Sequence, residues 1–162
     1  MSEILHAWAV APAAVGACCL AADRARVRPP EVVASVLMLL AMMDAAVSGI
    51  VAPVYWTALL LIAALALAVR RRPRQRRAPR VPALMTVHTT LGMVVMAGLQ
   101  LGMGGHTAAH AHGPALAPVL IGAVVGYIGL SALAARRMPA RLDRAQIAAM
   151  GASVLLMAAA SV

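Results

Sequence analysis

The chain alternates between long apolar runs and short clusters of charge, and this pattern predicts its elements. Six apolar segments lie between the charges, at residues 4–22, 32–52, 53–69, 83–104, 115–135 and 145–162. A helix needs about 20 apolar residues to cross the bilayer core, and about 17 is the lower limit. The runs are continuous and rich in Ala and Leu, whereas a membrane β-barrel requires alternation. We therefore predict an all-α integral membrane protein, a single domain over 1–162 with about six transmembrane helices.

Composition agrees with this prediction and argues against a soluble protein that binds nucleic acid. The chain is 63% hydrophobic and only 12% charged, whereas a soluble domain carries about a quarter charged residues. Its formal net charge of +9 would suggest nucleic acid in a soluble protein. However, no nucleic-acid motif accompanies the arginines, and Phe is absent. We expect the lipid bilayer, and no nucleic acid, as the partner.

The arginines predict the topology. All fourteen basic residues are Arg, and they fall within the loops 23–31, 70–82 and 136–144. With six crossings these three loops share one side, which the positive-inside rule makes cytoplasmic. Both termini and the His-rich loop 105–114 then face outward from a bacterial cytoplasmic membrane. The first apolar run lacks a preceding positive region, so we expect a retained helix and no cleaved signal peptide.

Asp44 is the only Asp, Glu, Lys or Arg inside the six predicted segments. A carboxylate at a helix centre costs about 2.5–3.5 kcal/mol on insertion scales, so it needs a purpose or a partner. Ser48 lies one turn further on, and Gln100 is predicted at a similar depth. Two interpretations stay open: a proton or ion relay, and a hydrogen-bonded residue that fixes helix packing.

The segment 83–104 carries a face of soft ligands. Met85, His88, Gly92, Met96 and Met103 recur at helical spacing. Thioether and imidazole groups suit Cu(I), which makes this face a candidate copper path. The structural alternative is that Met fills gaps between helices and that His88 bonds to an uncharged partner.

Three of the five histidines crowd into the loop after this segment, in the run "GHTAAHAH". A short loop can gather His106, His110 and His112 around one metal ion. Imidazoles suit Cu(II), Zn or Ni, and Met103 just before them would admit Cu(I). The alternative is that histidine is simply a tolerated polar residue where the chain leaves the membrane.

Pairs of glycines in two predicted helices suggest where these helices contact other helices. Gly98 and Gly102 form one small-x-x-x-small pair, and Gly122 and Gly126 form another. We expect the two segments to approach closely through these pairs, or to use them for a membrane partner or a homo-oligomer. The adjacent Cys18–Cys19 are expected to be small buried hydrophobic residues without redox or metal chemistry.

The runs "VHTTLGMVVMAG" and "GGH" resemble an uncharacterised actinobacterial family of small multi-pass membrane proteins. In that family, helices two and four each carry a His followed by helically spaced methionines. The positions that carry the resemblance are His88, Met93, Met96, Gly105–His106, Met38 and Met42. Ser35 stands where the family has the earlier His. The resemblance implies the helical architecture and no particular activity.

These patterns lead to one leading function and two alternatives. The chain has no nucleophile–base arrangement, phosphate loop or dinucleotide motif, so we do not expect an enzyme. The leading hypothesis is binding or passage of copper, captured by the loop histidines with Met103 and transferred along Met96, His88 and Met85. The alternatives are a non-catalytic accessory subunit of a membrane complex, and a small-solute or proton transporter that uses Asp44.

Overall fold

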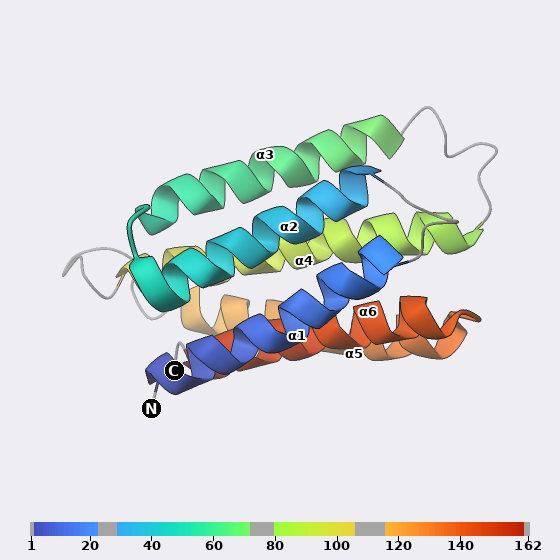
Figure 1. Cartoon of the computed structure of the whole chain (residues 1–162). Coiled ribbons are helices and arrows are strands. Elements are labelled where there is room, and N and C mark those ends of the chain that lie inside the picture. The colour runs from blue at the N-terminus through green and yellow to red at the C-terminus, as the bar shows by residue number, and fades with distance from the viewer. Residues whose placement is uncertain (1, 23–28, 72–79, 106–115, 161–162) are drawn as a thin grey trace.

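The computed structural model describes residues 2–22, 29–71, 80–105 and 116–160, which are helical except at two short turns, 49–52 and 138–140 (Figure 1). The α-helices are α1 Ser2–Ala22, α2 Pro29–Met43, α3 Pro53–Arg71, α4 Arg80–Gly105, α5 Leu116–Arg137 and α6 Arg141–Ala160. A π-helical turn, η2 Asp44–Ser48, continues α2. The described residues contain no strand, which confirms the predicted all-helical fold.

Five of the described helices are long and apolar enough to cross a membrane. The spans are Pro29–Ser48, Pro53–Arg70, Leu84–Gly102, Pro118–Arg137 and Arg141–Ala160. At 1.5 Å per residue, 20 residues reach about 30 Å, the thickness of the hydrocarbon core. Helix α1 contributes a shorter apolar stretch, Trp8–Cys19. Because helices satisfy their own backbone hydrogen bonds, this architecture suits lipid, and the chain has the character of a membrane protein.

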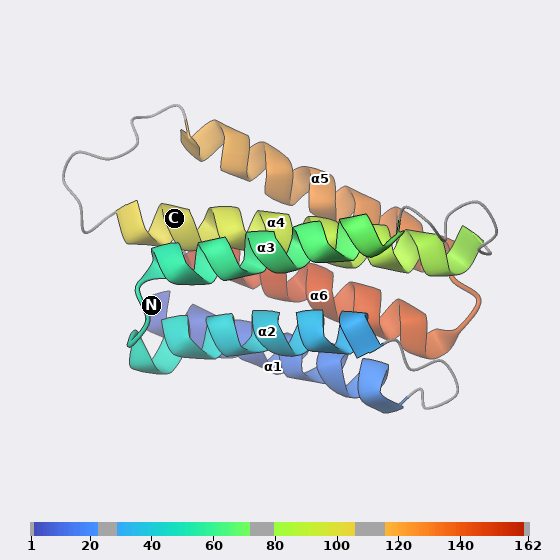
Figure 2. The same ribbon diagram turned by 90° about the horizontal axis from the view of Figure 1, so that it is seen from above.

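The helices run side by side with alternating direction (Figures 1 and 2). The start of α1, the end of α6 and the turn between α2 and α3 lie at one end of the bundle. The opposite end holds the end of α3 and the turn between α5 and α6. The exposed arginines of these segments are Arg70, Arg136, Arg137, Arg141 and Arg144. The described arginines therefore gather at one end.

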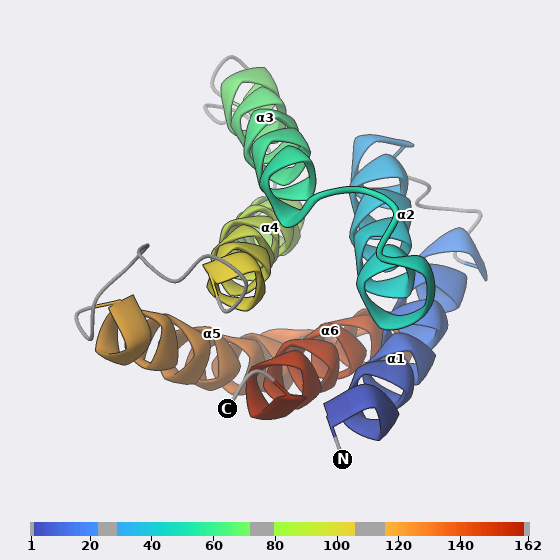
Figure 3. The same ribbon diagram turned by 90° about the vertical axis from the view of Figure 1, so that its left-hand side faces the viewer.

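Helix α4 lies among α2, α3, α5 and α6 when the bundle is viewed along its length (Figure 3). Polar side chains tie it to its neighbours. Gln100 Nε2 donates to the Ala41 carbonyl of α2 at 3.3 Å. Thr57 Oγ1 of α3 lies 3.2 Å from the Ala97 carbonyl and 2.9 Å from the Pro53 carbonyl of its own helix, so the two carbonyls share its single proton. In an apolar interior such bonds satisfy groups that lipid cannot, so they fix how the helices pack.

Several helices begin earlier than the apolar pattern predicts, and in two of them the added turn contains a buried acid. Helix α2 begins at Pro29 and α6 at Arg141. Glu31 is consequently buried and accepts a hydrogen bond from Thr86 Oγ1 at 2.7 Å, and Asp143 is buried as well. The expectation that Asp44 is the only Asp, Glu, Lys or Arg within a span is therefore wrong.

The contact between α4 and α5 differs from the expected pairing of two small faces. Gly98 and Gly102 do lie against α5, because a Cβ added there would meet the Leu120 side chain at 2.9 and 3.2 Å. Gly122 and Gly126, in contrast, have nothing within 4 Å. One small pair receives a large side chain and the other faces outward, so the predicted close approach of both pairs is wrong.

The outer surface of the bundle is strongly apolar. Large side chains such as Ile62, Leu65, Ile121 and Val125 are more than half exposed. Surfaces of this kind are unfavourable in water and are solvated by lipid tails. Cys18 also faces outward, so the expectation that it is a buried small hydrophobe is wrong. These faces are compatible with direct contact with the bilayer.

Candidate functional site

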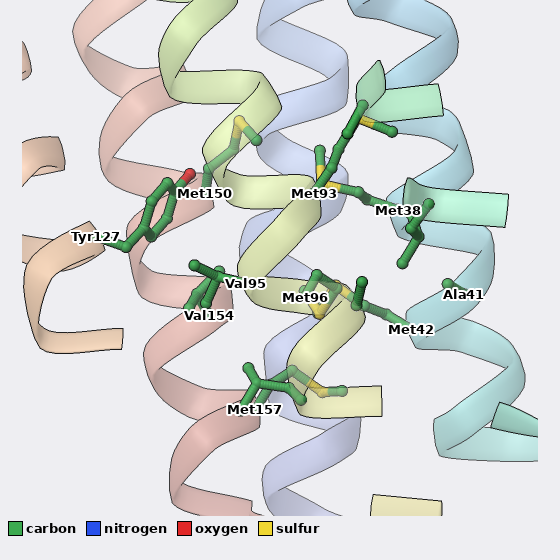
Figure 4. Close-up of a cluster of buried hydrophobic side chains, with 14 of the residues drawn as sticks. Met38, Ala41, Met42, Met93, Val95, Met96, Tyr127, Met150, Val154 and Met157 are labelled. Atoms are coloured by element: carbon green, nitrogen blue, oxygen red, sulfur yellow. The ribbon is translucent and has the colours of Figure 1, made fainter. Parts of the chain in front are cut away.

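Methionine dominates the interior of the bundle. Eight methionines are buried, and six of them share one core cluster (Figure 4). The six are Met38 and Met42 of α2, Met93 and Met96 of α4, and Met150 and Met157 of α6. The other two, Met85 and Met138, belong to a separate cluster. Thioethers from three helices therefore meet in a single region.

A small cavity opens within this region. Its volume is about 20 Å³, and a site of this size has room for roughly one water molecule. Four methionines line it, namely Met38, Met42, Met96 and Met150, and small residues of α1 complete the wall. Because Met is unbranched and has three rotatable side-chain bonds, these sulfur atoms can adjust to a guest.

Two hydroxyl groups also line the cavity, and they differ in their partners. Ser153 Oγ donates to the Ala149 carbonyl at 2.9 Å. Ser35 is 8% exposed, and its Oγ has no hydrogen-bond partner among the described residues. A buried hydroxyl left unpaired costs about 1–3 kcal/mol. The cavity therefore contains one polar atom whose bonding is incomplete.

His88 is held close to this region by uncharged groups. Its Nε2 lies 2.8 Å from Ser131 Oγ, and that hydroxyl donates its only proton to the Tyr127 carbonyl, also at 2.8 Å. Nε2 must therefore be the donor to Ser131. The imidazole also stacks on the Tyr127 ring, with centroids 4.9 Å apart. Since Nε2 carries this bond, it is not available as a metal ligand in this arrangement.

The residues predicted to form one face of α4 are divided between two places. Met96 lines the cavity, whereas Met85 packs with Ala134 and Ile147 in the second cluster. Met103 lies in the last turn of α4. The loop ligands His106, His110 and His112 lie outside the described residues. Within the described ranges, no three His, Cys, Asp or Glu side chains lie together as a metal site.

Asp44 organises the turn between α2 and α3. Its carboxylate accepts four hydrogen bonds: from Ser48 Oγ at 2.8 Å, Trp56 Nε1 at 2.7 Å, and the amides of Ile50 at 3.1 Å and Val51 at 3.2 Å. All of these donors belong to the turn or to the first residues of α3. The expected bond to Ser48 is present, and the packing interpretation accounts for every one of these contacts.

Comparisons of the chain with protein-family models, with curated proteins and with solved structures find no match. The resemblance to an actinobacterial membrane family therefore stays a prediction. Within the described residues, the methionine-lined cavity is the most distinctive chemical feature.

Sequence reasoning identified only part of the cavity. The sequence predicts Met96 as a ligand but not Ser35 or Met150, and Met38 and Met42 enter only through the resemblance to a membrane-protein family. A usable signal does exist in the sequence, because Ser35, Met38 and Met42 recur at i, i+3 and i+7 and so share a helix face. What the sequence does not contain is the fact that this face meets Met96 and Met150.

Proposed function

We propose that this chain is a multi-pass membrane protein that binds a soft transition metal ion, copper as Cu(I), and passes it into the interior of its helix bundle. The observation that supports this most strongly is the cavity lined by four methionines from three helices. Thioethers are soft ligands that select Cu(I) over hard cations. The proposed role is binding and transfer without catalysis.

The proposed route begins at the His-rich loop and follows α4 inward. His106, His110 and His112 would capture the ion, and Met103 in the last turn of α4 would receive it. Met96 lies seven residues away on the same helix, about 10 Å along the axis. His88 and Met85 are less suitable as later stations, because His88 Nε2 is bonded to Ser131 and Met85 packs in the other cluster.

We further propose that the membrane is the bacterial cytoplasmic membrane, with the Arg-rich loops 23–31, 70–82 and 136–144 inside. The loop 105–114 and both termini would then lie outside. This is supported by the gathering of the described arginines at one end of the bundle, since positive residues are retained on the cytoplasmic side. An outward loop suits capture from the extracytoplasmic space.

Metal analysis tests the proposed capture. We expect the full chain, purified in detergent, to hold copper after anaerobic exposure to Cu(I). We expect the triple variant His106→Ala, His110→Ala, His112→Ala to hold less copper, because imidazoles are effective copper ligands. Thr107→Ala changes a loop residue without a ligating side chain and should match the parent chain. If the parent protein stays free of copper under these conditions, the proposed function is wrong.

One observation favours a second role, that of an accessory subunit. Gly122, Gly126 and Gly129 lie on α5 with nothing within 4 Å, and small outward residues allow another helix to approach closely. Cross-linking in native membranes distinguishes the two roles, since an accessory subunit must yield adducts that Gly126→Leu removes. The transporter alternative receives less support, because Asp44 is fully engaged in its own turn.

A further inference from the structure

We propose that the cavity between α2, α4 and α6 is a binding site for one soft monovalent cation, Cu(I) or its analogue Ag(I). The ligands are the thioethers of Met38, Met42, Met96 and Met150, and the Ser35 hydroxyl lies beside them. This inference rests on the proposed function, and it names both the interior site and the class of ion. The site includes Gly92 and Met96 of the predicted α4 face, but neither His88 nor Met85.

The ligand set determines which ions fit. No His, Cys, Asp or Glu is among the residues that line the cavity. Zn²⁺ in proteins is bound by thiolate, imidazole or carboxylate, and Ca²⁺ and Mg²⁺ require several oxygen ligands. Four thioethers do not provide the ligands that these divalent ions prefer, but they suit Cu(I). The chemistry of the wall therefore excludes the common divalent ions.

The charge of the ion also determines which ions the cavity can hold. Thioethers and hydroxyls are neutral, so an ion in the cavity keeps its full charge inside an apolar bundle. The cost of burying an ion in a medium of low dielectric constant is high and rises with the square of its charge. A monovalent ion with four polarizable sulfur ligands is therefore the species that this interior can hold most readily.

Each of the three helices contributes residues of one face to the wall of the cavity. On α2, Met38 and Met42 share a face with Ser35. On α4, Gly92 stands one turn before Met96, and both line the cavity. The missing side chain at Gly92 lets Met150 come close to α4, since its Cε lies 3.4 Å from the position that a Cβ would take. A volume of about 20 Å³ admits a bare ion but not one with a hydration shell.

The unpartnered hydroxyl of Ser35 is an independent indication of a guest. Its residue is buried, and its oxygen has no bond within the described structure. Buried polar groups are usually satisfied, so an exception calls for a cause such as a bound ion or water. A cation in the cavity would accept a lone pair of this oxygen and complete its bonding.

The test compares two pairs of methionines that are equally buried. The full chain in detergent micelles is titrated with Cu(I) and, separately, with Ag(I), each in competition with a chromophoric chelator. In the cavity variant Met42→Leu/Met96→Leu, we expect the affinity to fall by more than about 100-fold, beyond the loss typical of outer-shell changes. In the control variant Met85→Leu/Met138→Leu, from the second cluster, we expect it to stay unchanged.

Each outcome has a distinct meaning. If both double variants bind as the parent chain does, and only the loop triple variant loses copper, the cavity site is wrong while the proposed function stands. If the parent chain binds neither ion, both are wrong. Equal losses in the two double variants would also overturn the site, because the effect would then not belong to the cavity.

Two further measurements keep the proposal testable if the double variant folds poorly. Met and Leu differ little in volume, so a packed core tolerates each single exchange, and Met150→Leu alone should already weaken Ag(I) binding. Ser35→Ala should weaken it further. In the loop triple variant, Zn²⁺ should show no binding, and binding of Zn²⁺ as tight as that of Ag(I) would overturn the proposed ion class.

Discussion

Replacing His88 with alanine is expected to lower the free energy of unfolding by about 2–4 kcal/mol. The residue is 1% exposed, so truncation leaves a cavity at the contact of α4 with α5. It also removes the bond to Ser131 and the stacking on Tyr127. The measurement is reversible unfolding in mixed micelles, followed by circular dichroism as the denaturing detergent fraction rises.

His88→Phe separates the bond from the packing. The phenyl ring keeps the stacking on Tyr127, so the expected loss is only that of one interhelical hydrogen bond, about 0.6 and at most about 1.7 kcal/mol. Copper binding by this variant should equal that of the parent chain. If His88→Phe abolishes copper binding without unfolding the protein, the metal route passes through His88 and the cavity site is misplaced.

Gly92→Ala is expected to destabilise the protein by about 1–3 kcal/mol, the usual cost of overpacking a filled core. A Cβ at this position would lie 2.7 Å from Tyr127 Oη, 3.2 Å from Tyr127 Cζ and 3.4 Å from Met150 Cε. The tyrosine cannot move away easily because its ring is buried and stacked on His88. The same unfolding measurement gives the size of the loss.

Tyr127→Phe tests whether the Tyr127 hydroxyl causes the destabilisation by Gly92→Ala. Tyr127 Oη has no hydrogen-bond partner among the described residues, so its removal alone should be neutral or slightly stabilising. In the double variant the closest contact disappears, and we expect about 1 kcal/mol of the Gly92→Ala loss to be recovered. Strictly additive effects of the two changes would show that the crowding at Gly92 does not involve this hydroxyl.

The helical architecture could be predicted from the sequence because it depends on local properties. Apolar runs of about 20 residues, separated by arginines, predict helices and their order directly. Boundaries were less accurate where polar residues open a helix. The apolar pattern placed the last segment at 145–162, whereas α6 begins at Arg141. Asp143 in its first turn is favourable at a helix N-terminus, although it adds nothing to the apolar signal.

Contacts between helices were harder to predict because they depend on how the helices rotate and pack. The bond from Ser48 to Asp44 follows from a spacing of four residues and was expected, whereas the bond from Trp56 requires the turn itself. Likewise, the spacing on α4 groups Met85 with Met96 on one face. It does not show that Met96 meets α2 and α6 while Met85 meets the end of α5.

X-ray absorption at the copper K-edge, on the full chain loaded with less than one equivalent of Cu(I), reports the atoms that bind the metal. We expect a first shell made mainly of sulfur, as the four thioethers around the cavity require. The shell should lose sulfur in Met42→Leu/Met96→Leu and persist when the three loop histidines are replaced by alanine. A first shell of imidazole nitrogen without sulfur would contradict a methionine site inside the bundle.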